Sequence, residues 1–130
     1  MLSKTSTQVI NAFVELARLD KDQFAGAVNI ADKIKAPKNY LGKMLQSFSY
    51  RGLLVSQKGS GGGFQLAKEA SKISLYDIVE PIENISIWSE CALGMKRCSQ
   101  VNPCAVHDRW SKVRDVYYQF LKTTYISDLV

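Results

Sequence analysis

Several features are absent from this sequence of 130 residues, and each absence excludes a class of protein. No apolar run approaches the ~20 residues that a membrane-spanning helix needs. The N-terminal residues contain no apolar block followed by a small-residue cleavage site, as a secretory signal peptide would. Cysteine is missing from residues 1–90 and 105–130. We therefore expect one cytoplasmic domain without membrane association, in which clustered cysteines are metal ligands or redox sensors rather than structural disulfides.

Recognisable catalytic motifs are also missing. The sequence has no serine–histidine–aspartate set and no recognisable pair of carboxylates, and its glycine run lacks the Gly-Lys-Ser/Thr ending of a phosphate-binding loop. A redox enzyme would have to be built from one segment, because that segment holds all three cysteines and the single histidine. We therefore predict that the protein is not an enzyme.

Acidic residues are scarce in the first half of the chain. Residues 1–60 contain nine Lys/Arg and four Asp/Glu, whereas residues 61–130 contain eight of each. The densest cationic stretch holds Lys33, Lys35, Lys38, Lys43, Arg51 and Lys58, next to the single anion Asp32. This asymmetry favours a polyanion as the partner of the first half; a solvated charged surface is the alternative interpretation.

The apolar periodicity of the first half predicts three helices. They cover residues 5–19, 26–33 and about 38–52, with Ser3, Thr5 or Ser6 as the first N-cap and a polar link over 20–25. In the second helix, Val28, Ala31 and Ile34 are expected to face inward. The short connection between the last two helices is typical of a helix-turn-helix, whose second helix enters the major groove of DNA.

The start of that second helix holds the predicted DNA contacts, which are Lys38, Asn39, Tyr40 and Lys43. Lysine is suited to guanine in the major groove, and asparagine is suited to adenine. For Tyr40, packing against the protein interior is the alternative to a contact with DNA. Lys4, near the start of the first helix, is a further predicted phosphate contact.

Residues 53–66 predict a β-hairpin, because two alternating stretches flank glycines at positions 59 and 61–63. A helix-turn-helix followed by a hairpin is the order of elements in a winged helix. The glycines favour a flexible tip at which backbone N–H groups can approach a phosphate. The predicted contacts of this wing are Lys58, Ser60, Gly61 and Gly62.

The second half predicts a short helix and a long one. Ser74 is expected to cap a helix over residues 73–80 that stops at Pro81, and residues 82–103 lack a period. Asn102 as N-cap and Pro103 as first residue predict a final helix of ~20 residues. Its apolar stripe consists of Val106, Trp110, Val113, Tyr117 and Phe120. We expect this stripe to pack on a second copy and form a dimer, with packing on its own winged helix as the alternative.

The predicted fold is therefore mainly α with a small β-hairpin wing. A winged helix-turn-helix domain covers residues 1–81, a cysteine-rich loop covers 82–103, and a dimerisation helix with a C-terminal tail covers 104–130.

The cysteine-rich segment has the spacing Cys91-x6-Cys98-x5-Cys104-x2-His107. Three thiolates and an imidazole form a soft ligand set that suits zinc or an iron–sulfur cluster rather than magnesium or calcium. We expect Cys104 in the first turn of the last helix, where the helix dipole favours the thiolate. A thiol sensor that forms a Cys91–Cys98 disulfide is an alternative, as is simple packing of His107 against Trp110.

Three parts of the sequence together carry a family resemblance. They are NYLGKMLQSFSYRGLLVSQKGSGGGFQLAK, ISLYDIVEPIE and the three-cysteine loop before the final helix. With them, the chain resembles the Rrf2 family of bacterial winged-helix regulators over residues 2–130. The resemblance implies a homodimeric transcription factor that binds a palindromic operator, acts as a repressor, and senses through an iron–sulfur cluster. The signal would be nitric oxide, redox state or iron–sulfur status.

The resemblance also implies a ligand set. Cluster-binding members usually have five residues in each gap between cysteines, whereas the first gap here has six. Their fourth ligand is a histidine three residues after the last cysteine or an acidic residue near the N-terminus. Thr7 and Gln8 occupy the N-terminal position here, so His107 is the expected fourth ligand. A 2Fe–2S cluster is favoured over 4Fe–4S. Because some members lack the full cysteine set, control by thiol oxidation, zinc or a protein partner is the alternative.

Overall fold

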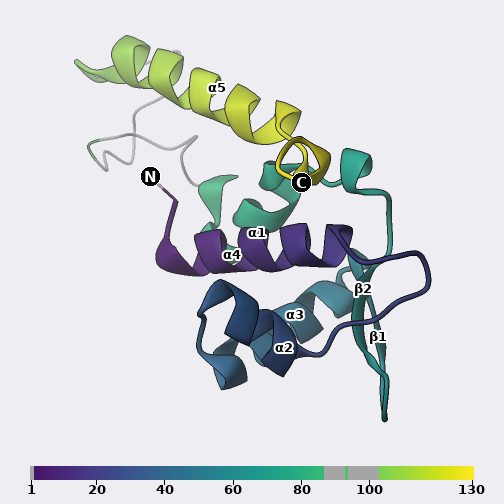
Figure 1. Cartoon of the computed structure of the whole chain (residues 1–130). Helices are drawn as coiled ribbons and strands as arrows, with labels where there is room; N and C mark the ends of the chain where they lie inside the picture. The colour runs from purple at the N-terminus through teal and green to yellow at the C-terminus, as the bar shows by residue number, and fades with distance from the viewer. Residues whose placement is uncertain (1, 87–92, 94–102) are drawn as a thin grey trace.

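The computed structural model describes residues 2–86, 93 and 103–130 of the chain. In chain order the elements are α1 (Lys4–Ala17), α2 (Ala27–Ile34), α3 (Lys38–Tyr50), β1 (Leu54–Gln57), β2 (Gly63–Leu66), η1 (Ala70–Lys72), α4 (Leu75–Glu83), α5 (His107–Thr123) and η3 (Ile126–Asp128). Figure 1 shows α1 at the centre, with α2, α3 and the hairpin on one side and α4 and α5 on the other. The predicted fold class, mainly α with a β-hairpin wing, is confirmed.

The central helix α1 is buried on more than one face. Ser3 is its N-cap, and the Ser3 hydroxyl accepts a hydrogen bond from the Ser6 N–H at 3.1 Å. The buried side chains of α1 are Ser6, Val9, Ile10, Ala12, Phe13, Val14 and Leu16. Because α1 packs against α2, α3, α4 and β2, these residues lie on opposite sides of the helix and join both halves of the domain in one core.

The helix-turn-helix forms where it is expected, but one inward residue of α2 was predicted wrongly. Val28 is 53% exposed, whereas Ile30 and Ala31 are buried. The buried stripe of α2 follows the helical spacing of Ala27, Ile30, Ala31 and Ile34, and Val28 lies beside that stripe. In α3 the buried residues are Leu41, Leu45 and Phe48, again at helical spacing.

The hairpin is antiparallel and pairs Leu54 with Leu66 and Gln57 with Gly63. A third backbone segment joins it, which the sequence did not indicate. Ala25 exchanges two backbone hydrogen bonds with Phe64, at 3.0 Å and 2.8 Å, so the segment expected to be only a polar link also supports the wing.

Two wing glycines are required by close approach of backbone atoms. A Cβ atom at Gly63 would lie 2.3 Å from the Ala25 carbonyl oxygen, and one at Gly62 would lie 2.2 Å from the Gln57 carbonyl oxygen. Gly63 also has φ +135°, a conformation that side chains disfavour. These two glycines therefore allow the backbone contacts that shape the wing. The sequence suggested only that the glycines make a flexible tip.

Helix α4 begins as expected and ends later than expected. Ser74 and Asp77 form a capping box, with hydrogen bonds of 3.0 Å and 3.1 Å. The prediction that Pro81 stops the helix is wrong, because α4 continues to Glu83 and ends at Asn84 in the left-handed conformation. A proline removes one helical N–H, here the donor for the Asp77 carbonyl, and the packing of α4 on α1 tolerates that absence.

The last helix also differs from the prediction. Helix α5 begins at His107 with Val106 as N-cap, so Pro103 and Cys104 precede the helix, and Asn102 lies outside the described residues. Most of the predicted irregular loop, residues 87–92 and 94–102, likewise lies outside them, while 82–83 belong to α4. Of the helices in the described part of the chain, none is long and apolar enough to cross a membrane.

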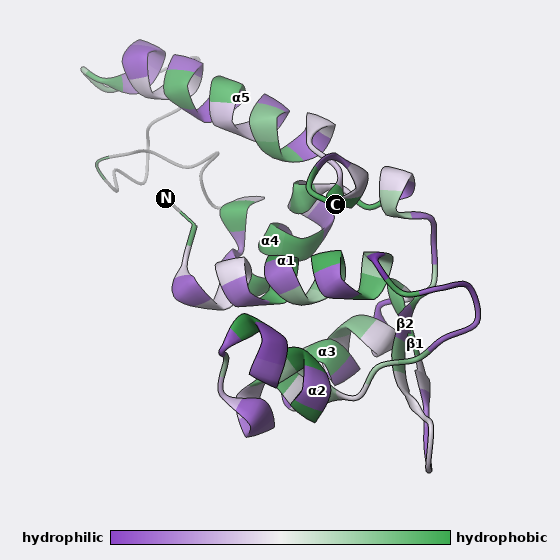
Figure 2. Ribbon diagram, in the orientation of Figure 1, coloured by the Kyte–Doolittle hydropathy of each residue, from purple (hydrophilic) through white to green (hydrophobic). Residues whose placement is uncertain are grey.

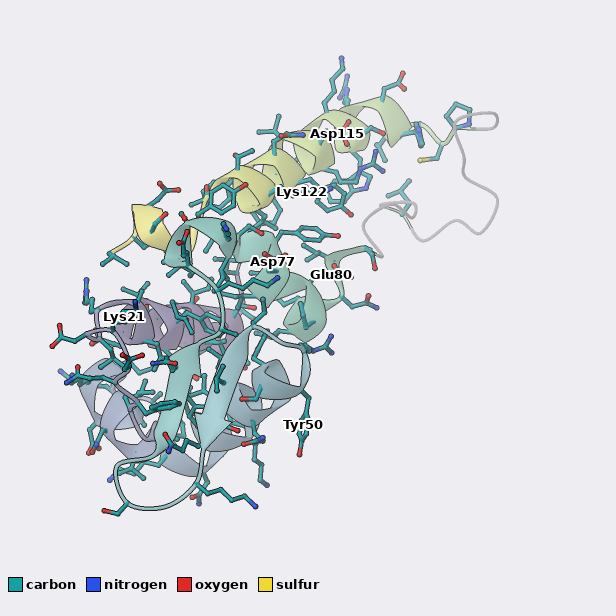
Figure 3. All side chains as sticks on the ribbon, turned by 90° about the vertical axis from the view of Figure 1, so that its right-hand side faces the viewer. Lys21, Tyr50, Asp77, Glu80, Asp115 and Lys122 are labelled. Carbon is teal, nitrogen blue, oxygen red and sulfur yellow. The ribbon has the colours of Figure 1, made fainter. Side chains whose placement is uncertain are left out.

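The C-terminal end of α5 is fixed to the winged helix. Leu121 and Ile126 are fully buried. The backbone after α5 pairs with the start of α4, since the Leu75 N–H donates to the Thr124 carbonyl and the Ile126 N–H to the Ile73 carbonyl, each at 2.9 Å. Lys122 lies on the side of α5 that faces α4, with its ammonium 5.0 Å from the ring centroid of Tyr76 (Figure 3).

Replacing Gly63 by alanine is expected to lower the free energy of unfolding by about 1–3 kcal/mol, since the new Cβ would separate β2 from Ala25. Urea denaturation followed by circular dichroism measures the change. Gly42→Ala is the matched control. Gly42 lies within α3, and a Cβ there would make an ordinary 3.5 Å contact with Ala27 of α2. The control should be neutral or stabilising by up to about 1 kcal/mol. Equal stabilities of the two variants would contradict the role assigned to Gly63.

Candidate functional site

The exposed surface of α3 is held in place by the buried face of the same helix. Leu41, Leu45 and Phe48 are fully or almost fully buried, and the Phe48 ring meets Phe13 of α1 edge to face at 5.4 Å. The predicted DNA contacts Lys38, Asn39, Tyr40 and Lys43 are all exposed. A rigidly packed second helix of a helix-turn-helix therefore presents these four side chains to solvent.

The cations of the first half are also exposed. Six of them lie on α2, α3, the hairpin and the turns that join these elements, at Lys33, Lys35, Lys38, Lys43, Arg51 and Lys58. Asp32 of α2 pairs with Lys38 of α3, and their charged atoms are 3.3 Å apart. Exposed ion pairs of this kind are worth about 0–1 kcal/mol, so the pair orients the Lys38 amine without holding it strongly.

Tyr40 connects the second helix of the motif to α1. Its hydroxyl lies 3.2 Å from the Thr5 hydroxyl, and either oxygen can donate the hydrogen bond. The residue is 46% exposed, so the alternative that Tyr40 packs into the interior is wrong. Lys4, the neighbour of Thr5 in the first turn of α1, is exposed. The predicted phosphate contact Lys4 therefore directly precedes Thr5, which contacts α3 through Tyr40.

The wing residues differ in what they can offer a partner. Lys58, Ser60 and Gly61 are exposed at the tip of the hairpin, which extends beyond the helices in Figure 1. Gly62 is half-buried, and its N–H donates to the Gly59 carbonyl at 3.0 Å. Its backbone donor is therefore used inside the turn, and the side chains of Lys58 and Ser60 are the accessible polar groups.

Of the four predicted metal ligands, the structure describes two. Cys104 and His107 lie at the two ends of one turn, in which the His107 N–H donates to the Cys104 carbonyl at 3.1 Å. Such a turn keeps the two Cα atoms within about 7 Å of each other. The expectation that Cys104 lies in the first helical turn is wrong, since Val106 is the N-cap, but His107 is the first residue of α5.

The His107 side chain lines a groove of about 500 Å³. Its other lining residues are Pro103, Asp108, Ser111, Lys112 and Asp115. Cys91 and Cys98 lie outside the described residues, and within the described ranges no three His, Cys, Asp or Glu side chains form a metal site. The two described donors fit a zinc or iron–sulfur site, because a thiol and an imidazole from one turn are ligands that both accept.

One face of α5 is apolar and exposed. Val113, Val116 and Phe120 are 61%, 72% and 48% exposed, and with Trp110 and Tyr117 they line a groove of about 670 Å³. In Figure 2, hydrophobic and hydrophilic residues alternate along this helix. The predicted stripe missed Val116, although a step of three residues from Val113 indicates it, and Val106 of that stripe is the N-cap of the helix.

The whole sequence matches the Rrf2 family, described as iron-dependent transcriptional regulators, over residues 2–130. A protein of Aquifex aeolicus (strain VF5) that is named as an HTH-type transcriptional regulator is 36% identical over 132 residues, which cover 100% of this chain and 91% of that protein. The HTH-type transcriptional regulator IscR of Yersinia pestis is 23% identical, over 99% of this chain and 78% of IscR.

Solved structures show the same fold. The structure of CymR, the global cysteine regulator of B. subtilis, has a TM-score of 0.83 at 22% identity and covers 99% of this chain and 95% of CymR. IscR of T. potens has a TM-score of 0.78 at 22% identity, with 99% and 85% covered. The oxidized form of CymR from Staphylococcus aureus has a TM-score of 0.77 at 22% identity, with 99% and 94% covered.

Replacing Lys43 by glutamine is expected to weaken DNA binding and to reduce the slope of log K against log salt by about 0.9 for each phosphate that the lysine neutralises. Lys43 is exposed one turn after the start of α3, where it can reach the DNA backbone. A salt series of fluorescence anisotropy titrations measures the slope. Lys72→Gln serves as control, since Lys72 is an exposed lysine of η1, outside the motif. An identical slope for both variants would exclude binding of Lys43 to a phosphate.

Proposed function

The chain belongs to the Rrf2 family of transcriptional regulators, and from this premise we propose that it is a repressor controlled by an iron–sulfur cluster. In this proposal it binds a palindromic operator as a homodimer. The observation that carries the DNA-binding part is the exposed first turn of α3, which presents Lys38, Asn39 and Tyr40 on a helix anchored in the core.

The assignment of DNA contacts follows from side-chain chemistry and position. Lys38 and Asn39 lie at the N-terminal end of the second helix, the part that meets base edges in a helix-turn-helix. Lysine can donate to guanine O6 and N7, and asparagine can form two hydrogen bonds with adenine. Lys4, Lys43, Lys58 and Ser60 are proposed to bind phosphates, where they set the register of the protein on the duplex.

The apolar face of α5 supports the dimer. Val113, Val116 and Phe120 lie on a different side of the helix from Tyr118 and Lys122, which pack towards α4. An exposed apolar surface of this kind usually marks an interface. A two-fold dimer would place the same face of both copies in contact, and a palindromic DNA site has the same symmetry.

The cluster would be held by Cys91, Cys98, Cys104 and His107. When bound, it would supply a centre that reacts with oxidants and nitric oxide. The turn that carries Cys104 and His107 leads directly into α5, so ligand binding would constrain the start of the proposed dimer helix. This connection supports control of DNA binding by the state of the cluster.

A cluster-free regulator is the second candidate function. The similarity in fold to CymR favours it, because that protein is described as the global cysteine regulator of B. subtilis and not as an iron–sulfur protein. Zinc bound by the same residues is a further alternative, since zinc also accepts three thiolates and an imidazole. Both share the DNA-binding part of the proposal.

Anaerobic purification of the protein is expected to give a coloured sample that contains iron and acid-labile sulfide in equal amounts. Substitution of Cys104 by serine should remove the colour, and Ser111→Ala, in the groove that His107 lines, is its control. A colourless sample that stays colourless after reconstitution with iron and sulfide contradicts the cluster. Zinc in that sample would indicate a zinc site, and DNA binding that changes with thiol oxidation would indicate a thiol sensor.

Val116→Glu is expected to convert the dimer into a monomer, because a carboxylate would have to be buried in the apolar contact. Sedimentation equilibrium measures the mass. Val28→Glu makes the same change at an exposed valine of α2, and that variant should remain a dimer. A dimeric Val116→Glu protein would show that the interface lies elsewhere.

A further inference from the structure

The first turn of α1 is held by the far end of α4. The Glu83 carboxylate accepts hydrogen bonds from the Ser3 N–H, at 3.0 Å, and from the Ser6 hydroxyl. These two residues also cap α1, since the Ser3 hydroxyl accepts from the Ser6 N–H. One carboxylate, 77 positions from Ser6 in sequence, therefore fixes the residues that define the start of the central helix.

The charge on Glu83 strengthens this contact. Burial tends to raise the pKa of the Glu83 carboxyl, but the hydrogen bonds from Ser6 and Ser3 outweigh it and hold the pKa below its ordinary value of 4.5. The group is therefore ionised at neutral pH, and hydrogen bonds to an ionised acceptor are shorter and stronger than neutral ones. Ser6 is fully buried, so water does not compete for its hydroxyl.

The same turn of α1 touches the predicted DNA-binding surface. Thr5 lies 3.2 Å from the Tyr40 hydroxyl of α3, and Lys4 is exposed beside it. Within this turn, Ser3 and Ser6 donate hydrogen bonds to Glu83 of α4, and Thr5 contacts Tyr40 of α3. The rest of α1 is anchored separately by Val9, Phe13 and Leu16 in the core.

We propose that Glu83 is a positioning residue for DNA binding: by holding the first turn of α1, it places Lys4 on a phosphate and Thr5 against Tyr40. The inference rests on the DNA-binding role proposed above for Lys4 and Tyr40. Without the carboxylate, the first turn frays, since helix ends lack internal hydrogen-bond partners, while the core-packed remainder of α1 stays folded.

The test compares Glu83→Gln with Glu80→Gln. Glu80 lies one turn earlier in α4 (Figure 3), and its carboxylate accepts from the Ser86 N–H at 2.9 Å, so both variants lose one negative charge and one carboxylate acceptor. The probe is a fluorescent duplex that the wild-type protein selects from a randomised pool. Affinity is measured over a salt series, and thermal unfolding by circular dichroism is recorded for each variant.

Glu83→Gln should bind the duplex roughly 2- to 10-fold more weakly than Glu80→Gln. Its salt slope should be lower by about 0.9 for each phosphate that Lys4 no longer neutralises. Lys4→Gln should show the same slope as Glu83→Gln, and the double variant should lose less affinity than the sum of the two single losses, because part of the effect of Glu83 acts through Lys4 and the rest through Tyr40. Equal affinity and slope for Glu83→Gln and Glu80→Gln, or additive effects in the double variant, would overturn the inference.

Ser6→Ala provides a second variant that changes no charge. It removes the hydroxyl donor to Glu83 and should lower the affinity and the slope in the same direction. An unchanged slope with lowered thermal stability would reduce Glu83 to a purely structural contact. If the wild-type protein selects no duplex at all, the proposed function fails together with this inference, whereas selection by the wild type and equal binding by Glu83→Gln and Glu80→Gln refutes the inference alone.

Discussion

Phe13 of α1 and Phe48 of α3 meet edge to face with ring centroids 5.4 Å apart, and both side chains are fully buried. Aromatic pairs of this geometry contribute about 0.5–1.5 kcal/mol beyond the burial of their surface. The contact fixes α3 on the helix that also packs against α2, α4 and the hairpin. The polar start of α3 is therefore displayed by a helix whose opposite face is packed into the core.

On the α4 side of the domain, the segment that follows α5 packs back onto the core. Leu121 and Ile126 fill the core beside α4, and two backbone hydrogen bonds join residues 124 and 126 to residues 75 and 73. The Tyr118 hydroxyl adds a bond of 2.7 Å to the Ile85 carbonyl. Helix α5 is thus fixed at its C-terminal end, while its first turns carry His107 and the exposed valines. A structural change at the start of α5 would therefore act on a helix whose C-terminal end is packed in the winged-helix core.

Periodicity predicted the elements whose stability comes from burial. The apolar stripes of α1 and α3 predicted the bounds of both helices to within a few residues, and the turn glycines indicated the hairpin. The errors arose where a local signal competed with tertiary contacts. Helix α4, which packs on α1, continues past Pro81, and Val28 was expected in the core because its spacing from Ala31 allowed it.

Only part of the candidate site could be predicted, again because the sequence does not reveal tertiary contacts. Exposed lysines and an asparagine at the start of a helix can be read directly from the chain, whereas the contacts that position them join distant residues. No sequence pattern relates Thr5 to Tyr40, Asp32 to Lys38 or Glu83 to Ser6. Cys91 and Cys98 lie outside the described residues, so the ligand set that includes them stays a prediction from spacing and resemblance.

The pairing of Asp32 with Lys38 shows how weak contacts can serve recognition. An exposed ion pair contributes about 0–1 kcal/mol, whereas a good bidentate contact with the correct base discriminates by about 1–3 kcal/mol. If Lys38 contacts a guanine as proposed, the guanine edge would displace Asp32 from the Lys38 amine at little cost. In the same proposal, a sequence without that guanine would leave Asp32 beside the DNA with no compensating contact, and its repulsion of the phosphates would oppose binding. A surface with six exposed cations favours every duplex through its phosphates, and Asp32 is the single anion beside this stretch of sequence that would oppose such binding in the proposed complex.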